Sequence, residues 1–515
     1  MSKEQVQENG RNDDQGLYLC CALTVLKYCL IFNQVIALGK IIIKLWAFFA
    51  RSDMSDMSDK QIILLMKGIS MKFIIIGGDA AGMSAASRAK RNKPEMNVCV
   101  YEQTQDVSYS ACGMPYNIAD ADRDIDDLVV RKANVFREKQ NIDLRLGHRV
   151  ESIDTSNKKI MGTDSGGKHF SDNYDHLLIA TGASPILPDL PGSNLPGVFA
   201  LKALGDGRKI KQFLKPELKK AVIVGMGYIA LEMAEAFHQR GIAVSMIKPK
   251  PQLLPWMSSK LASRVLKELQ DHDVQVFDGH PIDGIELYNN QLKIVSKDVS
   301  LTGNIVLTAI GVRPNSQLAK DAQIKTGPSD AILVDTKMAT TGVDVYAAGD
   351  CASVIHKVSK QQTWIPLALY ANRGGWTVAD NVCGKNKYVG GIVGTAVFKV
   401  FGLEVARTGL NMTEARKYGY EPVEIVIQSR SRAHAHPGSG KIDVSMIGDV
   451  VSGRLLGVQM VGEEGVAHRI NAPAIALHAN MSVEEFALSD LAYAPPFSPV
   501  WDPLLTAANQ LLKKM

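Results

Sequence analysis

One cysteine stands in a setting that suggests redox chemistry. Cys112 lies in the segment Ser108–Tyr116, ten residues after Glu102, where an apolar strand is expected to end. An enzyme with a pair of redox cysteines would carry the second one five residues later, but this chain has Asn117 there. A lone thiol cannot close an internal disulfide, so its oxidised state must be a mixed disulfide with a substrate or a sulfenate.

To act as a nucleophile, Cys112 has to be a thiolate, so we expect a lowered pKa, supported by a polarised cofactor and a helix N-terminus. The other cysteines show no C-x-x-C spacing and no regular framework. We therefore expect a reducing, cytoplasmic compartment in which most of them are buried and unreactive. They are Cys20, Cys21, Cys29, Cys99, Cys351 and Cys383.

A glycine-rich turn opens the region that must position this cysteine. The stretch Ile74–Ala86 runs from an apolar strand through glycines into a helix of small residues. Gly77 would permit the tight turn and Gly82 the close packing of helix and strand, so that the helix N-terminus faces a pyrophosphate. Asp79 replaces the usual middle glycine, whereas Glu102 ends the next strand where a ribose hydroxyl would bind. The predicted cofactor contacts are Gly77, Ala80, Ala81, Gly82 and Glu102.

A second glycine turn, Ala221–Glu232, fits the dinucleotide pattern more closely. Its second strand, Ala243–Ile247, is followed by Lys248 where an acid would pair with a ribose diol. A lysine there, backed by Lys250, favours the 2′-phosphate of NADPH over NADH. The alternative is that Lys248 only caps a solvated strand end. The predicted contacts are Gly225, Gly227, Ala230 and Lys248.

Two more strands complete the pattern. Tyr174–Ala183 is an apolar strand that ends in a turn with Thr181 and Gly182. Val343–Asp350 is another, and Asp350 would bring a carboxylate near the ribityl chain of a flavin. In order with the two glycine turns, these strands predict an α/β chain with two nested Rossmann-like dinucleotide-binding folds.

Taken together, these motifs resemble the pyridine nucleotide–disulfide oxidoreductases, in the single-cysteine branch of coenzyme A disulfide reductases, NAD(P)H oxidases and peroxidases, and persulfide reductases. The resemblance covers residues 71–515. It implies FAD, NADPH or NADH, and a homodimer. It places an FAD-binding domain at 71–185 and 314–388, an NAD(P)H-binding domain at 186–313, and an α+β dimerisation domain at 389–515.

Within the branch, the chain is most similar to coenzyme A disulfide reductase. Cys112 matches the redox cysteine, and Leu491–Ser498 matches a Tyr-Ala-Pro-Pro segment that reaches flavin and thiol across the dimer interface in relatives. The resemblance implies hydride transfer from NAD(P)H to the flavin, electron transfer to Cys112, and proton donation by Tyr493 to the departing thiol. It also implies a pocket for coenzyme A phosphates, although each of its members alone is more typical of a surface residue. They are Arg88, Arg91, Ser108 and Lys139.

The chain also departs from these relatives, which leaves the sulfur acceptor open. Oxidases and peroxidases of the branch carry a histidine in the first glycine turn, where this chain has Asp79–Ala81. Coenzyme A disulfide reductases carry a second tyrosine in a Tyr-Tyr-Pro-Gly segment, where this chain has Arg432–Gly438. His434 or His436 could take over the proton transfer there. A persulfide or polysulfide reductase, an NAD(P)H oxidase and a non-enzymatic redox sensor therefore remain alternatives.

Composition narrows the class of partner. The 515 residues are 46% hydrophobic and 22% charged, as in a globular protein with an ample core, and the net charge is only +5. We expect a small-molecule substrate, no nucleic-acid partner and no metal. Residues 1–70 do not fit the rest, because charged and amide side chains interrupt the apolar stretch 17–50 before it reaches the ~18 residues of a spanning helix. We expect a misassigned start or a dispensable extension; a membrane anchor and a regulatory segment are the alternatives.

Overall fold

The computed structural model describes residues 71–515, and it groups Met71–Met515 as one compact unit. The expectations for residues 1–70 fall outside the described residues. Within 71–515, no helix is long and apolar enough to cross a membrane.

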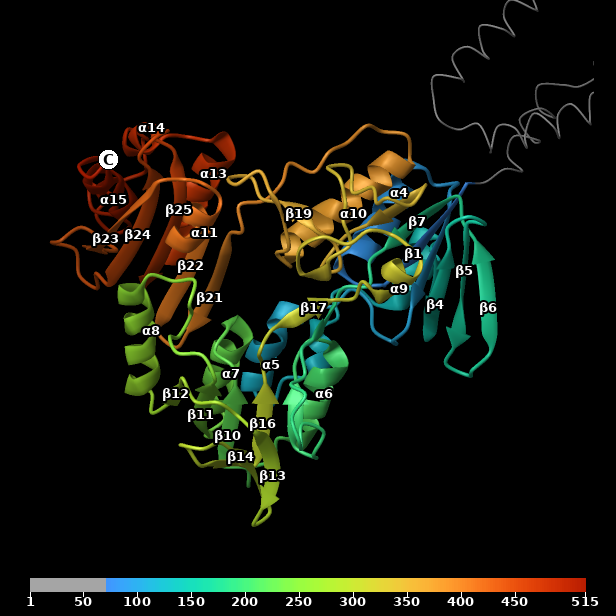
Figure 1. The fold of residues 1–515 in the computed structure, drawn as a ribbon, viewed down its shortest axis with the longest axis horizontal. Coiled ribbons are helices and arrows are strands. Elements are labelled where there is room, and N and C mark those ends of the chain that lie inside the picture. The colour runs from blue at the N-terminus through green and yellow to red at the C-terminus, as the bar shows by residue number, and fades with distance from the viewer. Residues whose placement is uncertain (1–70) are drawn as a thin grey trace, which may run out of the picture. The chain divides into compact units, whose positions relative to one another are not determined.

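A five-stranded parallel sheet has the strand order β18-β7-β1-β2-β3. Its strands are β1 (Lys72–Ile76), β2 (Asn97–Glu102), β3 (Asp143–Leu146), β7 (His176–Ile179) and β18 (Val345–Ala347). Figure 1 labels two of these strands, β1 and β7, near α4. The late strand β18 pairs with β7, so a segment near residue 345 completes a sheet begun at residue 72. Two helices with small residues along their contact, α4 (Ala80–Asn92) and α10 (Ala368–Val382), pack against each other beside this sheet.

A second parallel sheet, in the order β12-β11-β10-β16-β9, repeats the arrangement. Its strands are β9 (Val198–Ala200), β10 (Lys220–Val224), β11 (Ala243–Lys248), β12 (Gln275–Asp278) and β16 (Ile305–Thr308). Its helices are α6 (Leu204–Phe213), α7 (Tyr228–Gln239) and α8 (Ser259–Asp271). The central strand β10 is buried from Ala221 to Val224, as expected of a strand covered on both faces.

The C-terminal part is an antiparallel sheet in the order β21-β22-β25-β24-β23, covered by helices. The strands are β21 (Ala396–Val400), β22 (Leu403–Gly409), β23 (Pro422–Arg430), β24 (Lys441–Asp449) and β25 (Leu455–Gly462). The helices are α11 (Met412–Lys417), α12 (Val466–Arg469), α13 (Asn471–Ala479), α14 (Val483–Ala487) and α15 (Pro503–Leu512).

Shorter elements connect these three bodies. The small sheets are β4 (His148–Asp154) with β5 (Lys159–Asp164) and β6 (His169–Asn173), β13 (Gly284–Tyr288) with β14 (Gln291–Val295) and β15 (Leu301–Gly303), β8 (Ala183–Pro185) with β17 (Val312–Pro314), and β19 (Val354–Ile355) with β20 (Gln362–Thr363). The remaining α-helices of the described chain are α5 (Met114–Ala119) and α9 (Gln317–Asp321). The predicted fold class is confirmed: two parallel dinucleotide-type sheets and an α+β C-terminal body. The exact domain boundaries stay a prediction.

Candidate active site

A cavity of about 850 Å³ opens at the carboxyl edge of the first parallel sheet. The chain leaves β1, β2, β7 and β18 at this same edge, because parallel neighbours end on one side of a sheet. The structure thereby brings most of the residues predicted to bind the first cofactor to one cavity. Those that line it are Gly77, Ala80, Ala81, Glu102, Thr181, Gly182 and Asp350.

The first glycine turn has the geometry that a bound dinucleotide needs. Gly77 has a left-handed φ of 110°, and a Cβ there would lie 2.2 Å from the carbonyl oxygen of Ala180. Gly82 is buried rather than cavity-lining, and its Cβ would lie 1.9 Å from the carbonyl oxygen of Gly77, so it serves helix–strand packing. The Glu102 carboxylate accepts a hydrogen bond from the amide of Gly78 (2.8 Å), which fixes an acid at the end of β2. The cradle, the helix N-terminus and the acid together fit FAD.

Two charged residues that were not among the predicted cofactor contacts, Lys202 and Asp79, also line this cavity. Lys202 follows β9 and its Nζ lies 2.8 Å from Asp350. Asp79 begins α4, and burial above all raises its pKa to about 6, with the negative charges of Glu102 and Asp350 acting in the same direction. The amide of Tyr109 and the ammonium of Lys202 act against that rise. Lys202 is therefore the positive charge that offsets a cluster of carboxylates.

Cys112 lies next to this cavity and is exposed. It sits in a short 3-10 helix, Ala111–Gly113, directly before α5, and Ala111 is one of the residues that line the cavity. Desolvation raises the pKa of the thiol most, although the residue keeps an exposed face, and the charge of Glu232 raises it further. Lys202 lowers it. Burial and the neighbouring charges together therefore raise the pKa of Cys112, whereas the sequence led us to expect a lowered pKa.

The remaining described cysteines are buried and free, as expected: Cys99, Cys351 and Cys383. Among residues 71–515, Cys112 is therefore the single cysteine that a substrate in solution can reach. Cys20, Cys21 and Cys29 lie outside the described residues.

A hydrogen bond links the cysteine-bearing helix to the second dinucleotide fold. The hydroxyl of Tyr116, on α5, donates to Glu232, on α7, at 2.8 Å. Burial raises the pKa of Glu232, while this hydrogen bond lowers it. Motif matching missed the pair because Tyr116 and Glu232 are far apart in the sequence.

The second glycine turn repeats the first. Gly225 has a φ of 120°, and a Cβ there would lie 2.2 Å from the carbonyl oxygen of Ala309. By contrast, a Cβ on Gly227 would meet no protein atom within 4 Å, which leaves the start of α7 open to a ligand. Ala230 is buried one turn into that helix.

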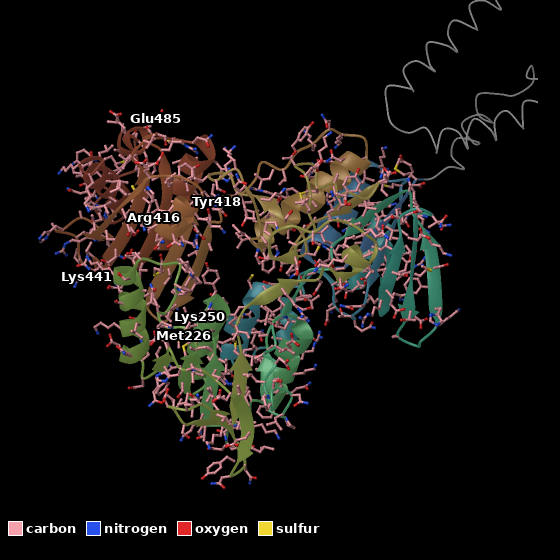
Figure 2. All side chains as sticks on the ribbon, in the orientation of Figure 1. Met226, Lys250, Arg416, Tyr418, Lys441 and Glu485 are labelled. Carbon is pink, nitrogen blue, oxygen red and sulfur yellow. The ribbon has the colours of Figure 1, made fainter. Side chains whose placement is uncertain are left out.

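Lys248 stands at the end of β11, on the same edge of the sheet. Its Nζ donates to the carbonyl oxygen of Gln252 at 2.9 Å, and burial lowers its pKa. Figure 2 labels Met226, in the second glycine turn, and Lys250, just beyond β11. Because β10 and β11 are parallel neighbours, these two loops border one binding edge.

The four residues predicted to hold a coenzyme are placed differently. Arg88 is engaged within the protein, since its guanidinium donates to both carboxylate oxygens of Asp380 at 2.9 and 2.7 Å. Arg91 and Lys139 are exposed. Ser108 has a left-handed φ of 49°, an uncommon conformation for a serine, at the head of the cysteine segment.

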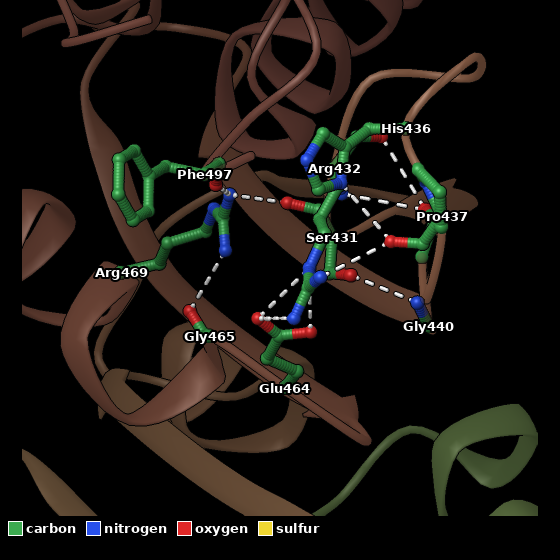
Figure 3. A network of polar contacts seen from close by, with 10 residues as sticks. Ser431, Arg432, His436, Pro437, Gly440, Glu464, Gly465, Arg469 and Phe497 are labelled. Carbon is green, nitrogen blue, oxygen red and sulfur yellow. Dashed lines mark hydrogen bonds and ion pairs between the residues drawn. The ribbon is translucent and has the colours of Figure 1, made fainter. Parts of the chain in front are cut away.

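The segment that carries Tyr493 contacts the loop 431–440, which stands where coenzyme A disulfide reductases carry a second tyrosine. The amide of Ala433 donates to the carbonyl oxygen of Pro495 at 3.0 Å, so the loop 431–440 and the segment Leu491–Ser498 are joined. Figure 3 shows His436 beside Pro437 in this loop, and the Nδ1 of His436 lies 3.0 Å from the carbonyl oxygen of Pro437. Tyr493 is 48% exposed and His434 is exposed.

Comparisons with known proteins agree with this geometry. Residues 71–375 match the family described as pyridine nucleotide-disulphide oxidoreductase, and residues 395–504 match the dimerisation domain of that family. A protein of Pyrococcus horikoshii named NAD(P)H coenzyme A polysulfide/persulfide reductase is 38% identical over 446 residues, 86% of this chain and 99% of that protein.

Two further relatives differ in their named substrates. The solved structure of an NAD-dependent persulfide reductase from A. fulgidus is 33% identical, with a TM-score of 0.83, covering 86% of this chain and 83% of that one. A coenzyme A disulfide reductase of Staphylococcus haemolyticus is 26% identical, covering 83% of this chain and 96% of that protein.

Proposed function

The chain belongs to the pyridine nucleotide-disulphide oxidoreductase family, and from this premise we propose that it reduces the S–S bond of a small persulfide or polysulfide at Cys112. It is an FAD-dependent NAD(P)H oxidoreductase acting on sulfur compounds. The names of two similar proteins, from Pyrococcus horikoshii and A. fulgidus, support a persulfide or polysulfide as the acceptor.

The exposed thiol of Cys112 carries the proposal. It borders the cavity that fits FAD, and the other described cysteines are buried. Within residues 71–515, Cys112 has no accessible cysteine to pair with, so the disulfide in the proposed reaction forms with the substrate. This suits an acceptor that contains an S–S bond.

In the proposed reaction, the Cys112 thiolate attacks the inner sulfur of a persulfide R–S–SH. The S–S bond of the persulfide breaks, a new S–S bond forms between Cys112 and R–S, and hydrosulfide leaves with a proton as H₂S. Two electrons and one proton then cleave this mixed disulfide to release R–SH and restore the thiolate. When bound, FAD carries those two electrons from NAD(P)H to the sulfur.

The proton for the departing R–SH is the part we assign to Tyr493. In this proposal Tyr493 reaches the cysteine of a second copy of the chain, since the match to a dimerisation domain supports a homodimer. Large apolar side chains near Tyr493 are exposed, which is typical of a surface that a partner covers. They are Leu488, Phe497, Val500 and Trp501.

Coenzyme A disulfide is the second candidate acceptor, and the relative from Staphylococcus haemolyticus supports it. Arg91 and Lys139 are exposed and free to meet phosphates. Arg88 is less suited, because Asp380 already occupies its guanidinium. The preference for NADPH through Lys248 and a cytoplasmic location both stay predictions.

Intact mass under denaturing, non-reducing conditions tests the proposal. After incubation with polysulfide or coenzyme A disulfide, the wild type should carry a thiol-removable adduct that Cys112→Ser lacks. An adduct of the mass of coenzyme A would favour the second candidate. An adduct that persists in Cys112→Ser would contradict the role of Cys112.

A further inference from the structure

The backbone that carries Tyr493 is held by a tight turn that begins at the next residue. The carbonyl oxygen of Ala494 accepts hydrogen bonds from the amides of Phe497 (2.9 Å) and Ser498 (3.0 Å). Because Tyr493 adjoins this turn, the placement of the turn sets the position of the Tyr493 backbone. The contacts that fix the turn therefore bear on the chemistry of Tyr493.

One guanidinium holds this turn against three other segments. Arg469, at the end of α12, donates to the carbonyl oxygen of Phe497 at 2.6 Å and to that of Ser431 at 3.0 Å. It also donates to the carboxylate of Asp502 at 2.8 Å, and only 12% of its side chain is exposed. Figure 3 shows the guanidinium between the carbonyl groups of Phe497 and Ser431.

Asp502 extends the same attachment. Its Oδ1 accepts from the amide of Leu504 at 2.8 Å and so caps α15. Its Oδ2, which accepts from Arg469, also accepts from the buried hydroxyl of Ser498 at 3.1 Å. The arginine and its carboxylate therefore join the turn after Tyr493 to the start of a helix. A carboxylate at a helix N-terminus is also favoured by the helix dipole.

The absence of a side chain at Gly465 leaves room for the guanidinium of Arg469. Gly465 has a left-handed φ of 78°, and its carbonyl oxygen accepts from Arg469 at 3.1 Å. A Cβ on Gly465 would lie 2.2 Å from a guanidinium nitrogen of Arg469. A second arginine, Arg432, helps to fix the loop 431–440, to which Arg469 also binds, because the guanidinium of Arg432 pairs with Glu464 at 2.9 Å (Figure 3).

We propose that Arg469 is a positioning residue for Tyr493: it fixes the turn after this tyrosine so that the phenol can protonate the departing thiol. The inference rests on the acid role proposed for Tyr493 above. A lysine could not replace Arg469, because one ammonium cannot stand both at the position of Nε, beside Asp502, and at the position of Nη2, between the carbonyl oxygens of Ser431 and Phe497.

The test is a double-mutant cycle of Arg469→Lys with Tyr493→Phe, measured on the dimeric holoenzyme with polysulfide and NADPH under anaerobic conditions. Loss of a general acid lowers a rate by about 10²-fold or more, and misplacement of an acid by a smaller factor, roughly 10-fold. The expected result is that Arg469→Lys slows the wild type but does not slow Tyr493→Phe further. Arg469→Lys should also lower kcat while leaving KM for polysulfide almost unchanged, because the acid acts on the departing thiol and not on substrate binding.

The matched control is Arg264→Lys. Arg264 is another largely buried arginine that joins segments, through Asp443 (2.7 Å) and the carbonyl oxygen of Lys441 (3.1 Å), but it has no contact with the turn after Tyr493. The effect of Arg264→Lys on the rate should multiply with that of Tyr493→Phe. The dimer mass and the melting temperature of each variant show whether the fold is retained.

Three results would overturn the proposal. Suppose that Tyr493→Phe slows the reaction, and that Arg469→Lys either slows Tyr493→Phe further by its full factor or leaves the wild-type rate unchanged. The positioning role of Arg469 is then wrong, while the acid role of Tyr493 survives. If Tyr493→Phe keeps the wild-type rate, the acid role fails and the inference fails with it. If Arg469→Lys yields no dimer, Ala433→Pro, which removes the donor to Pro495, must show the same non-multiplying pattern, and a multiplying one overturns the proposal.

Discussion

The hydroxyl of Tyr116 donates a hydrogen bond to the carboxylate of Glu232 at 2.8 Å, and this contact joins the helix after Cys112 to the helix after the second glycine turn. Glu232 is also the charge that raises the pKa of the Cys112 thiol most. A single carboxylate thereby couples the predicted NAD(P)H edge to the predicted nucleophile.

Removing this carboxylate should make the thiol more acidic. A negative charge disfavours the thiolate, so Glu232→Gln should lower the pKa of Cys112 and increase the thiolate fraction at pH values below that pKa. The pH profile of iodoacetamide alkylation should then move to lower pH. Glu217→Gln, the same change at an exposed position, is the control. An unchanged profile, or one moved to higher pH, would contradict the coupling.

Replacement by alanine should have different effects at the two glycines of the second turn, on stability at Gly225 and on cofactor binding at Gly227. Gly225→Ala places a methyl 2.2 Å from the carbonyl oxygen of Ala309 at a φ of 120°, so we expect the free energy of unfolding to fall by about 2 kcal/mol or more. Gly227→Ala meets no protein atom and should keep its stability within roughly 1 kcal/mol, but raise the KM for NADPH. Chemical denaturation and steady-state kinetics measure both. Equal stability of the two variants would be inconsistent with this geometry.

Lys248 should discriminate between the two nicotinamide cofactors. An ammonium has three donors, and one of them is used on the carbonyl oxygen of Gln252, which leaves two for a phosphate. Loss of a charged hydrogen bond costs about 1.5–3 kcal/mol, so Lys248→Ala should raise the KM for NADPH about 10- to 100-fold and leave that for NADH almost unchanged. Lys250→Ala measures how much the neighbouring lysine contributes to the preference for NADPH. Equal changes with both cofactors would show that Lys248 only supports the strand end.

The exposed apolar surface near Tyr493 should be a subunit contact. Val500 is 65% exposed, and Val500→Glu would place a charge in that surface, so the dimer should dissociate into monomers. Val343→Glu makes the same change at a valine that is 72% exposed in the loop before β18, and should leave the dimer intact. Light scattering after size-exclusion chromatography gives both masses. A stable Val500→Glu dimer would place the interface elsewhere.

The sequence was most informative where the determinants are local. The apolar strand before the first glycine turn was predicted and is β1, which ends at Ile76, because an apolar run that stops at glycine marks the end of a strand. Both glycine turns followed from the same kind of signal, since φ values near 110–120° exclude other residues. The lone cysteine was recognised from its immediate neighbours.

The contacts that tune the site are long-range, and no local pattern encodes them. Lys202 comes from a connecting segment without periodicity, yet it pairs with Asp350 across the cavity. Arg88 was expected to face a ligand, but a carboxylate on another helix, Asp380, binds it. The desolvation of Cys112, and the charges of the carboxylates around it, likewise depend on the folded chain, which is why its pKa is raised and not lowered as expected.

Anaerobic NADPH oxidation by Cys112→Ser tests the central claim most directly. The wild type should oxidise NADPH in proportion to added polysulfide. The variant should keep its bound FAD and oxidise NADPH with ferricyanide as acceptor, but show no oxidation that depends on polysulfide or coenzyme A disulfide. Reduction of either sulfur acceptor by Cys112→Ser at the wild-type rate would contradict the account, because the electrons would then reach sulfur without this thiol.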